Sequence, residues 1–198
     1  MNNEEQSKKP SEMNPEELPD VRAFEDEFTR RFLQSTEETR PGYYPFLSGT
    51  GKYEMDFPSV GIMGEKGYAV KNDTSEGYLI GIDNQNDSES SINVNYDEFK
   101  GIKEVDSYLE NLEQRLGLKV EFEKYEDDNK VLYFSDYKRS KDISNYVGYV
   151  QNKKQNGGIE LIYKTKCADT VEECEQSMEA IVDWMKSINF IQISDGSE

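Results

Sequence analysis

The sequence predicts a single α+β domain: an antiparallel β-sheet of about six or more strands, covered by helices. The chain has 198 residues, which suits one domain of ordinary size. Short segments that alternate hydrophobic and polar residues recur along it, and the turns between them are too short for parallel crossovers. Three segments with helical periodicity stand at the start, the middle and the end of this series, so helices can cover the sheet.

The chain is expected to begin with a disordered tether, residues 1–19. This segment contains three of the six prolines and few apolar side chains, so burial cannot offset the entropy lost on ordering it. The α+β domain is then predicted to span residues 20–193, and a flexible polar tail residues 194–198.

Such a polar tether directly after Met1 is similar to the mature start of a bacterial lipoprotein of the Gram-positive type, where it follows a lipidated cysteine. On this interpretation Met1 replaces the cysteine and the signal peptide before it. The protein would then lie at the extracellular face of the cell membrane, attached only through its N-terminal lipid. The alternative is a cytoplasmic protein with a frayed N-terminus.

The first predicted helix covers residues 20–34. Asp20 can cap it, and Val21, Phe24, Phe28 and Phe32 recur on one face.

A loop is predicted next, over residues 36–51, because prolines, glycines and serines are frequent there. It contains Tyr43, Tyr44 and Phe46, which either pack onto the sheet or form a surface for a partner. The run Gly49–Lys52 has the composition of a phosphate-binding loop, but Phe46 stands where that motif requires its first glycine. Nucleotide binding is therefore not expected.

The remaining elements follow from periodicity. Gly117 supplies the C-terminal cap of the middle helix. The predicted strands are residues 52–57, 68–70, 78–82, 92–96, 119–125, 130–137, 146–151 and 159–164, and the predicted helices after the first are residues 103–116 and the segment from Asp169 or Thr170 to Met185, with a short strand-like piece at 189–193.

The order of the second half, a helix, four meandering strands and a helix ending in Ser187–Phe190, resembles the PsbP-like fold. A second point of resemblance is Tyr53–Pro58, a strand that runs into Phe-Pro. That fold is shared by extrinsic photosystem subunits, a nuclear Ran-binding protein and many small bacterial lipoproteins. The resemblance implies an α/β/α sandwich. Family members without enzymatic activity are common. The resemblance carries no catalytic residues onto this chain.

Charge and composition exclude several classes of function. Lys and Arg number 23 against 41 Asp and Glu, a net charge of −18, which repels nucleic acids and anionic lipid surfaces. Histidine is absent, so catalysis and zinc binding that depend on histidine are excluded. We expect no catalytic residue, no cofactor, no nucleic-acid partner and no insertion of the domain into a membrane.

Cys167 and Cys174 are the only cysteines. Their spacing does not match the two-residue separation of redox or zinc motifs. A disulfide between them would agree with export to an oxidising compartment. Buried free thiols are the alternative.

Asp83, Asp87 and Glu89 lie in a cluster of oxygen-bearing side chains that could hold Ca²⁺. The spacing departs from the calcium-loop motif at three positions, including Val94 in place of the bidentate glutamate. A solvated hairpin turn is the favoured interpretation.

Together these observations predict an exported, membrane-anchored lipoprotein that acts as a non-catalytic binding or accessory module for an unidentified envelope protein or complex. An intracellular protein-binding adaptor of the same fold is one alternative, distinguished by reduced cysteines. A carboxylate-dependent cell-wall hydrolase is the other, and it requires two carboxyl groups about 5–10 Å apart in a cleft.

Overall fold

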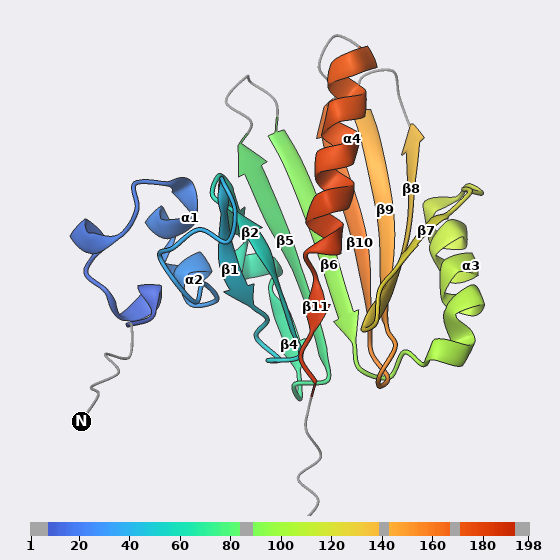
Figure 1. Cartoon of the computed structure of the whole chain (residues 1–198), viewed down its shortest axis with the longest axis horizontal. Coiled ribbons are helices and arrows are strands. Elements are labelled where there is room, and N and C mark those ends of the chain that lie inside the picture. The colour runs from blue at the N-terminus through green and yellow to red at the C-terminus, as the bar shows by residue number, and fades with distance from the viewer. Residues whose placement is uncertain (1–7, 84–88, 139–142, 167–170, 193–198) are drawn as a thin grey trace, which may run out of the picture.

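The computed structural model describes residues 8–83, 89–138, 143–166 and 171–192, and the side chains of 89, 138, 166 and 171–177 lie outside this description. The described chain forms two antiparallel sheets and several helices (Figure 1). The large sheet has the order β3-β5-β6-β10-β9-β8-β7, with β4 also paired to β5, and the small sheet has the order β1-β2-β11. An α+β architecture is therefore confirmed.

The large sheet consists of two runs of antiparallel strands, β3 to β6 and β7 to β10, joined by the pairing of β6 with β10; within each run the strands follow one another through short connections, as predicted. Its longest strands lie in the centre, where both faces are available for packing. Its strands are β3 (Gly61–Met63), β4 (Ala69–Lys71), β5 (Ser75–Asp83), β6 (Glu89–Asp97), β7 (Glu123–Glu126), β8 (Lys130–Lys138), β9 (Ile143–Asn152) and β10 (Gly158–Lys166).

Helices α3 (Val105–Leu116) and α4 (Val171–Lys186) cover opposite faces of the large sheet. Strand β9 shows this by alternation: Tyr146 and Val150 belong to the cluster that contains α4, whereas Val147 belongs to the cluster that contains α3. The α/β/α sandwich is therefore confirmed.

Helix α4 approaches the sheet closely at Gly148. A Cβ atom at this position would lie 2.9 Å from Sδ of Met185, and the missing side chain leaves room for the helix. Ile181, Trp184 and Met185 of α4 are buried in this contact.

Helix α3 ends as predicted. Gly117 has φ of 71°, and its N–H donates to carbonyls of the last helical turn. Leu112 and Leu116 pack against Tyr137 and Val147 of the sheet.

The prediction of a loop over residues 36–51 was wrong for part of its length. Strand β1 (Tyr43–Leu47) pairs with β2 (Tyr53–Pro58), which in turn pairs with β11 (Asn189–Phe190). Pro45 is tolerated because β1 forms the edge of the small sheet. The burial of Tyr44 and Phe46 stabilises β1, although the turn-forming residues in this segment predict a loop.

The predicted helix over residues 20–34 is also wrong. The chain forms two single turns instead, α1 (Arg22–Glu25) and α2 (Glu27–Arg30). Asp26, in extended conformation between them, caps the second turn: its carboxylate accepts from Thr29 N–H at 2.7 Å. The Thr29 hydroxyl in turn accepts from Met63 N–H at 2.9 Å, which fixes the break against the sheet.

Part of the predicted tether is ordered. Short 3₁₀ helices span η1 (Pro10–Glu12) and η2 (Pro15–Glu17), and Leu18 packs against the core. Each helix begins at a proline, whose fixed φ lowers the entropy lost on ordering. The prediction that residues 1–19 are disordered is therefore wrong from Pro10 onward. Residues 1–7 and 193–198 lie outside the described chain.

Candidate functional site

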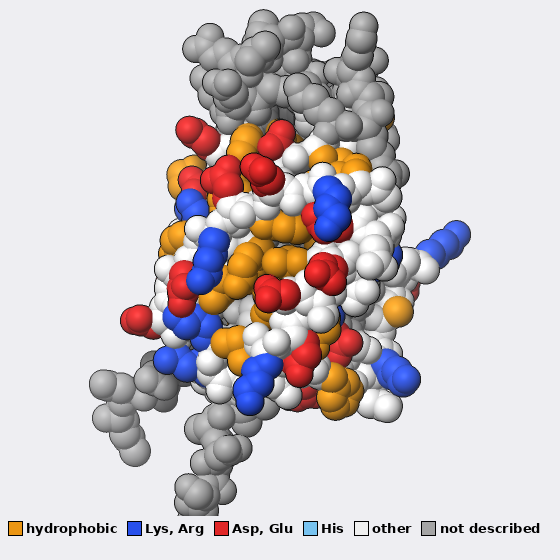
Figure 2. All heavy atoms as spheres, turned by 90° about the vertical axis from the view of Figure 1, so that its right-hand side faces the viewer, with side chains coloured by type: hydrophobic (Ala, Val, Ile, Leu, Met, Phe, Trp, Pro, Cys, Tyr) orange, Lys and Arg blue, Asp and Glu red, His pale blue; other side chains and the backbone are white. Residues whose placement is uncertain are grey.

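Part of the large sheet bears exposed side chains on the face that α3 covers elsewhere. Helix α3 packs on β8, β9 and β10 through Tyr137, Val147 and Ile162. Further along the same face, Leu79 of β5 and Asn93 of β6 are exposed. Figure 2 shows the side of the molecule that carries α3, where acidic and basic side chains surround exposed hydrophobic ones.

A polar groove of about 500 Å³ lies on this part of the sheet. Its volume falls within the range of small-molecule sites. We use the name polar groove for the cavity lined by Ala69, Val70, Lys71, Ser75, Glu76, Gly77, Asn95, Tyr96, Asp97, Lys100, Arg115 and Glu160.

Strand register explains which side chains meet in the polar groove. Lys71 pairs with Ser75 and Ser75 with Asp97, so these three form one row across β4, β5 and β6. In the next row Gly77 pairs with Asn95 and Asn95 with Glu160. Residues paired in this way point to the same face of a sheet.

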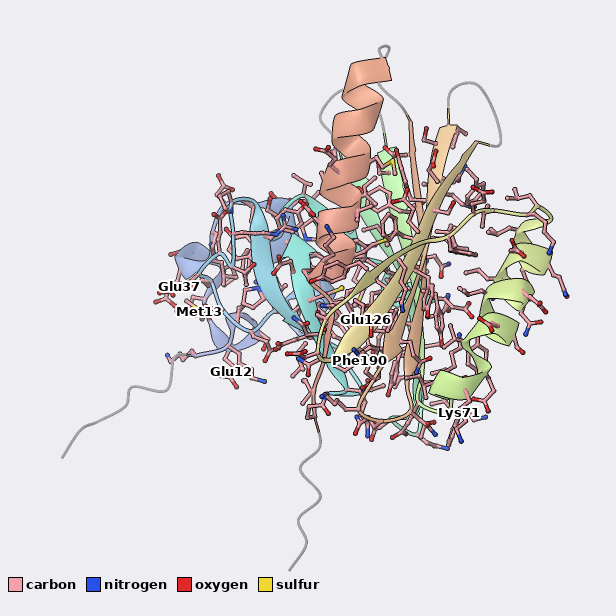
Figure 3. The ribbon with its side chains drawn as sticks, turned by 45° about the vertical axis from the view of Figure 1, so that its right-hand side comes forward. Glu12, Met13, Glu37, Lys71, Glu126 and Phe190 are labelled. Atoms are coloured by element: carbon pink, nitrogen blue, oxygen red, sulfur yellow. The ribbon has the colours of Figure 1, made fainter. Side chains whose placement is uncertain are left out.

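Small residues on β5 make the floor of the groove low. Ser75 and Gly77 occupy its middle, and Gly77 leaves space in which a Cβ atom would lie 3.0 Å from Oδ1 of Asn95. The walls are higher: Lys71 stands on β4 and Arg115 on α3. Figure 3 shows Lys71 on the side of the molecule that carries α3, away from Glu12, Met13 and Glu37.

Three charged side chains form the wall on the side of α3. Glu160 accepts from Lys100 through one oxygen and from Arg115 through the other. Lys100 is held further by the rings of Tyr108 and Tyr149, at 5.4 and 5.2 Å from its Nζ. Lys100 and Glu160 are thus largely buried in this wall, whereas Arg115 is more exposed.

Hydrogen bonds determine the protonation state of Glu160. Burial alone would raise the pKa of its carboxyl, but the bonds from Lys100 and Arg115 outweigh burial and hold the pKa below its ordinary value. Glu160 is therefore an anion at neutral pH and cannot act as a general acid there.

Arg115 presents more than half of its side chain to solvent. Its side chain is 58% exposed although it contacts Glu160. Helical side chains lean toward the N-terminus of their helix, so an arginine near the end of α3 reaches back to the groove. Within the described chain only its Nη2 atom is engaged by a partner.

Next to the groove, the segment between β6 and α3 displays two large apolar side chains. Phe99 is 73% and Ile102 is 50% exposed. The backbone between them is fixed, because the carbonyl of Lys100 accepts from Gly157 N–H at 2.8 Å and from the Gln151 amide at 3.2 Å. Exposed apolar side chains on a fixed backbone are typical of contact surfaces.

The loop Gly49–Lys52, which has the composition of a phosphate-binding motif, donates a hydrogen bond to a carboxylate of the chain itself. Gly49 N–H donates to Glu76 at 2.8 Å, on the sheet face opposite the polar groove. Burial raises the pKa of Glu76, and the bond from Gly49 opposes this shift. This carboxylate lies beside Tyr53, whose hydroxyl is 2.8 Å from that of Tyr78. The cluster holds the loop on the sheet.

The two motifs that suggested the fold meet in space. Phe190 pairs with Tyr53, and the hydroxyl of Ser187 accepts from Asp56 N–H at 3.1 Å. Trp184 donates to the Asp56 carbonyl at 2.8 Å. Both motifs are therefore structural: together they fix the end of α4 to the small sheet.

Lys130 is a buried cation that serves the same junction. Its Nζ donates to the carbonyls of Lys186 and Ile188 and to the Asn189 amide oxygen, at 2.6–2.7 Å. Burial lowers its pKa, and the neighbouring Asp127 carboxylate opposes this. Lys130 is a cap for α4.

Among the described residues, the site residues predicted from the sequence do not come together in one site. Tyr44 and Phe46 are buried in the core, so they pack onto the sheet and offer no partner surface, while Tyr43 is half-buried beneath the guanidinium of Arg40 at 3.7 Å. Asp83 contacts Arg22 at 3.4 Å. Asp87 and the side chain of Glu89 lie outside the described residues, as do Cys167 and the side chain of Cys174.

Among the described residues, no group of three or more acidic, cysteine or histidine side chains could hold a metal ion. The polar groove itself escaped sequence reasoning. Asn95 and Glu160 have no motif, and strand register brings them together, while Lys100 reaches Glu160 from the segment after β6. A polar residue at every second position of β6 is the signal that could have found Asn95.

Comparisons with known proteins were made for the sequence. A family named YvcA_Mog1p, described as "Putative lipoprotein YvcA", matches residues 19–189. A relative from Bacillus subtilis (strain 168), also named "Putative lipoprotein YvcA", is 27% identical over 209 residues, which cover 96% of this chain and 85% of the relative. The expected likeness to small bacterial lipoproteins is confirmed.

Two solved structures were found with the same overall likeness. The Ran-binding protein Mog1p of Saccharomyces cerevisiae has a TM-score of 0.49 and 12% identity, covering 74% of this chain and 94% of Mog1p. Cyanobacterial PsbP (CyanoP) from Synechocystis sp. PCC 6803 also has a TM-score of 0.49 and 12% identity, covering 80% of this chain and 99% of CyanoP. No helix in the described part of the chain has the length and apolarity required to span a membrane.

Proposed function

The chain belongs to the YvcA_Mog1p family, described as "Putative lipoprotein YvcA", and on this basis we propose that it is an exported lipoprotein with a binding role. A lipid at the N-terminus of the native protein holds it at the extracellular face of the cell membrane. The α+β domain binds another envelope component without catalysing a reaction, and the polar groove is its binding site.

The observation that carries this proposal is the polar groove, of about 500 Å³, between two walls that the fold fixes. Its floor is the β-sheet, and its charged wall is held by the Lys100–Glu160 pair. A preformed site loses little entropy when it binds. The exposed Phe99 beside the groove extends the surface available to a partner.

The carboxylates of the groove support binding over hydrolysis. A glycosidase needs one carboxyl with a raised pKa as a proton donor beside a second, ionised one. In the groove, Glu160 has a lowered pKa and is engaged by two cations. Among the described acidic side chains, Glu76 has a raised pKa, but its carboxylate contacts Gly49 on the other face of the sheet.

Site-specific photo-crosslinking in living cells tests the proposal. A photoreactive phenylalanine analogue replaces Asn95, which is exposed in the polar groove, in the lipidated native protein. The matched control carries the analogue at Glu123, an exposed position on β7 that does not line the groove. We expect a discrete adduct in the membrane fraction from position 95 and none from position 123.

Two results would contradict the proposal. One is the same set of adducts from both positions, which indicates random collision. The other is no adduct from position 95 while the protein is folded and present in the membrane fraction.

A further inference from the structure

We propose that the polar groove recognises an oxyanion of its ligand, a carboxylate or a phosphate, with Arg115 as the principal donor and Lys71 as a second cation on the facing wall. This inference rests on the proposed function, because it names the chemistry that the same groove would bind.

The charge of the groove is opposite to that of the chain. Its walls and floor contain three cations, Lys71, Lys100 and Arg115, against the two anions Asp97 and Glu160. The carboxylate of Glu76 is directed to the other face. The whole chain has a net charge of −18, but charges beyond about 8 Å are largely screened at physiological salt. The local excess of cations therefore governs which ligand charge is favoured.

The anions of the groove are already engaged. Lys100 is a direct partner of Glu160, so the charge of Arg115 is not required to neutralise it. Oδ1 of Asp97 accepts from Phe99 N–H at 2.9 Å. A cationic ligand would find both oxygens of Glu160 engaged by cations and one oxygen of Asp97 engaged by the backbone.

The cations, in contrast, have free donors. Arg115 uses one nitrogen on Glu160, its other nitrogens bond no described residue, and its side chain is 58% exposed. Such a fork suits the two oxygens of a carboxylate or phosphate. Lys71 is exposed and forms no ion pair with any described residue.

The dimensions of the groove favour a ligand longer than a single ion. Lys71 on β4 and Glu160 on β10 are separated by three inter-strand spacings, roughly 14 Å. The floor between them carries Ser75 and Asn95, whose hydroxyl and amide can bind other polar groups of the ligand. Arg115 would therefore bind one anionic group, and Lys71 would steer or bind a second.

Nuclear magnetic resonance titration of the ¹⁵N-labelled chain tests this inference. Inorganic phosphate and glutarate are the two probes, each compared with sodium chloride at equal ionic strength. We expect shifts at the Arg115 side chain and at the amides of Gly77 and Asn95 that chloride does not produce. The stronger probe identifies whether phosphate or carboxylate is preferred.

Substitutions separate a built site from general attraction. Arg115→Gln is expected to weaken binding about tenfold, the effect of one charge-assisted hydrogen bond. It should leave the fold intact because Lys100 still pairs with Glu160. Lys71→Gln should weaken binding less. The matched control Lys119→Gln removes a charge of equal sign from a side chain that is 91% exposed outside the groove, and it should change nothing.

The inference is overturned if neither probe gives localised shifts at tens of millimolar, or if Arg115→Gln binds as well as the parent chain. Should this happen while the position 95 adduct persists, the groove binds a ligand of another chemistry and the proposed function stands. Should the adduct also be absent, the proposed function fails as well.

Discussion

At the scale of single residues, buried charges hold the parts of this fold together. Lys130 is 2% exposed, and its ammonium satisfies carbonyls at the end of α4. Glu76 is 3% exposed and accepts from Gly49 N–H in the loop before β2. Each replaces water as the partner of backbone groups that would otherwise be unsatisfied.

Lys130→Met is expected to destabilise the domain by about 2–4 kcal/mol, because the carbonyls of Lys186 and Ile188 lose their donor in a buried position. Urea unfolding followed by circular dichroism measures this. Lys153→Met is the control: that ammonium also bonds a backbone carbonyl but is more exposed, so the loss should stay below about 1 kcal/mol. Equal losses of unfolding free energy in the two variants would show that the buried Lys130 ammonium contributes no more than that of Lys153.

The pH dependence of stability should depend on Glu76. Its pKa in the folded chain is raised above the ordinary 4.5, so the folded state binds this proton more tightly than the unfolded state. Glu76 therefore adds stability as pH falls from above the raised pKa toward 4.5, and that stability is lost as pH rises again.

Glu76→Gln should remove this contribution while keeping an acceptor for Gly49 N–H. Unfolding free energies of both chains, measured between pH 4 and 8, check the prediction. Relative to the variant, the parent chain should become steadily less stable toward higher pH. A constant difference between the two would mean that Glu76 has an ordinary pKa.

At the scale of elements, periodicity was a reliable guide only where hydrophobic residues repeat over a long segment. Helices α3 and α4 and strands β5, β6, β8, β9 and β10 lie where the sequence predicted them. The segment from residue 20 to 34 has the same apolar spacing as a helix, yet Asp26 caps a new turn in its middle. A local hydrogen bond therefore overrode the repeat.

Strand β1 escaped prediction for a related reason. Pro45 and Gly42 indicate a turn when neighbouring residues alone are considered. Only pairing with β2, which is near in sequence but unpredictable in register, gives Tyr44 and Phe46 their buried positions. Tertiary contacts, which no local pattern contains, decided this element.

The close packing of α4 on the sheet allows a prediction for substitutions at Gly148. A Cβ here would lie 2.9 Å from the flexible end of Met185, so Gly148→Ala should cost at most about 1 kcal/mol once the methionine moves. Gly148→Leu must displace the helix and should cost about 3 kcal/mol. Chemical denaturation measures both, with Gly67→Ala, where the space is open, as the control. If Leu costs no more than Ala, the helix is not closely packed at this point.

At the scale of the whole molecule, the layers and the family could be predicted from the sequence, and the binding site could not. The order of elements and the motifs at Tyr53–Pro58 and Ser187–Phe190 indicated the sandwich, and the structure shows that these motifs contact each other. The polar groove arises where α3 leaves β5 and β6 exposed, and this depends on helix placement. The sequence positions of single charged residues such as Lys100 and Glu160 do not indicate that these residues line one groove.

The proposed function requires that this face of the sheet is where the protein meets its envelope partner. Hydrogen exchange measured by mass spectrometry, with the domain alone and with isolated cell envelopes, tests that claim most directly. We predict slower exchange in residues 69–77 and 95–102, and unchanged exchange in β7 and β8. Unchanged exchange in both groove segments, or protection confined to another face, would contradict it.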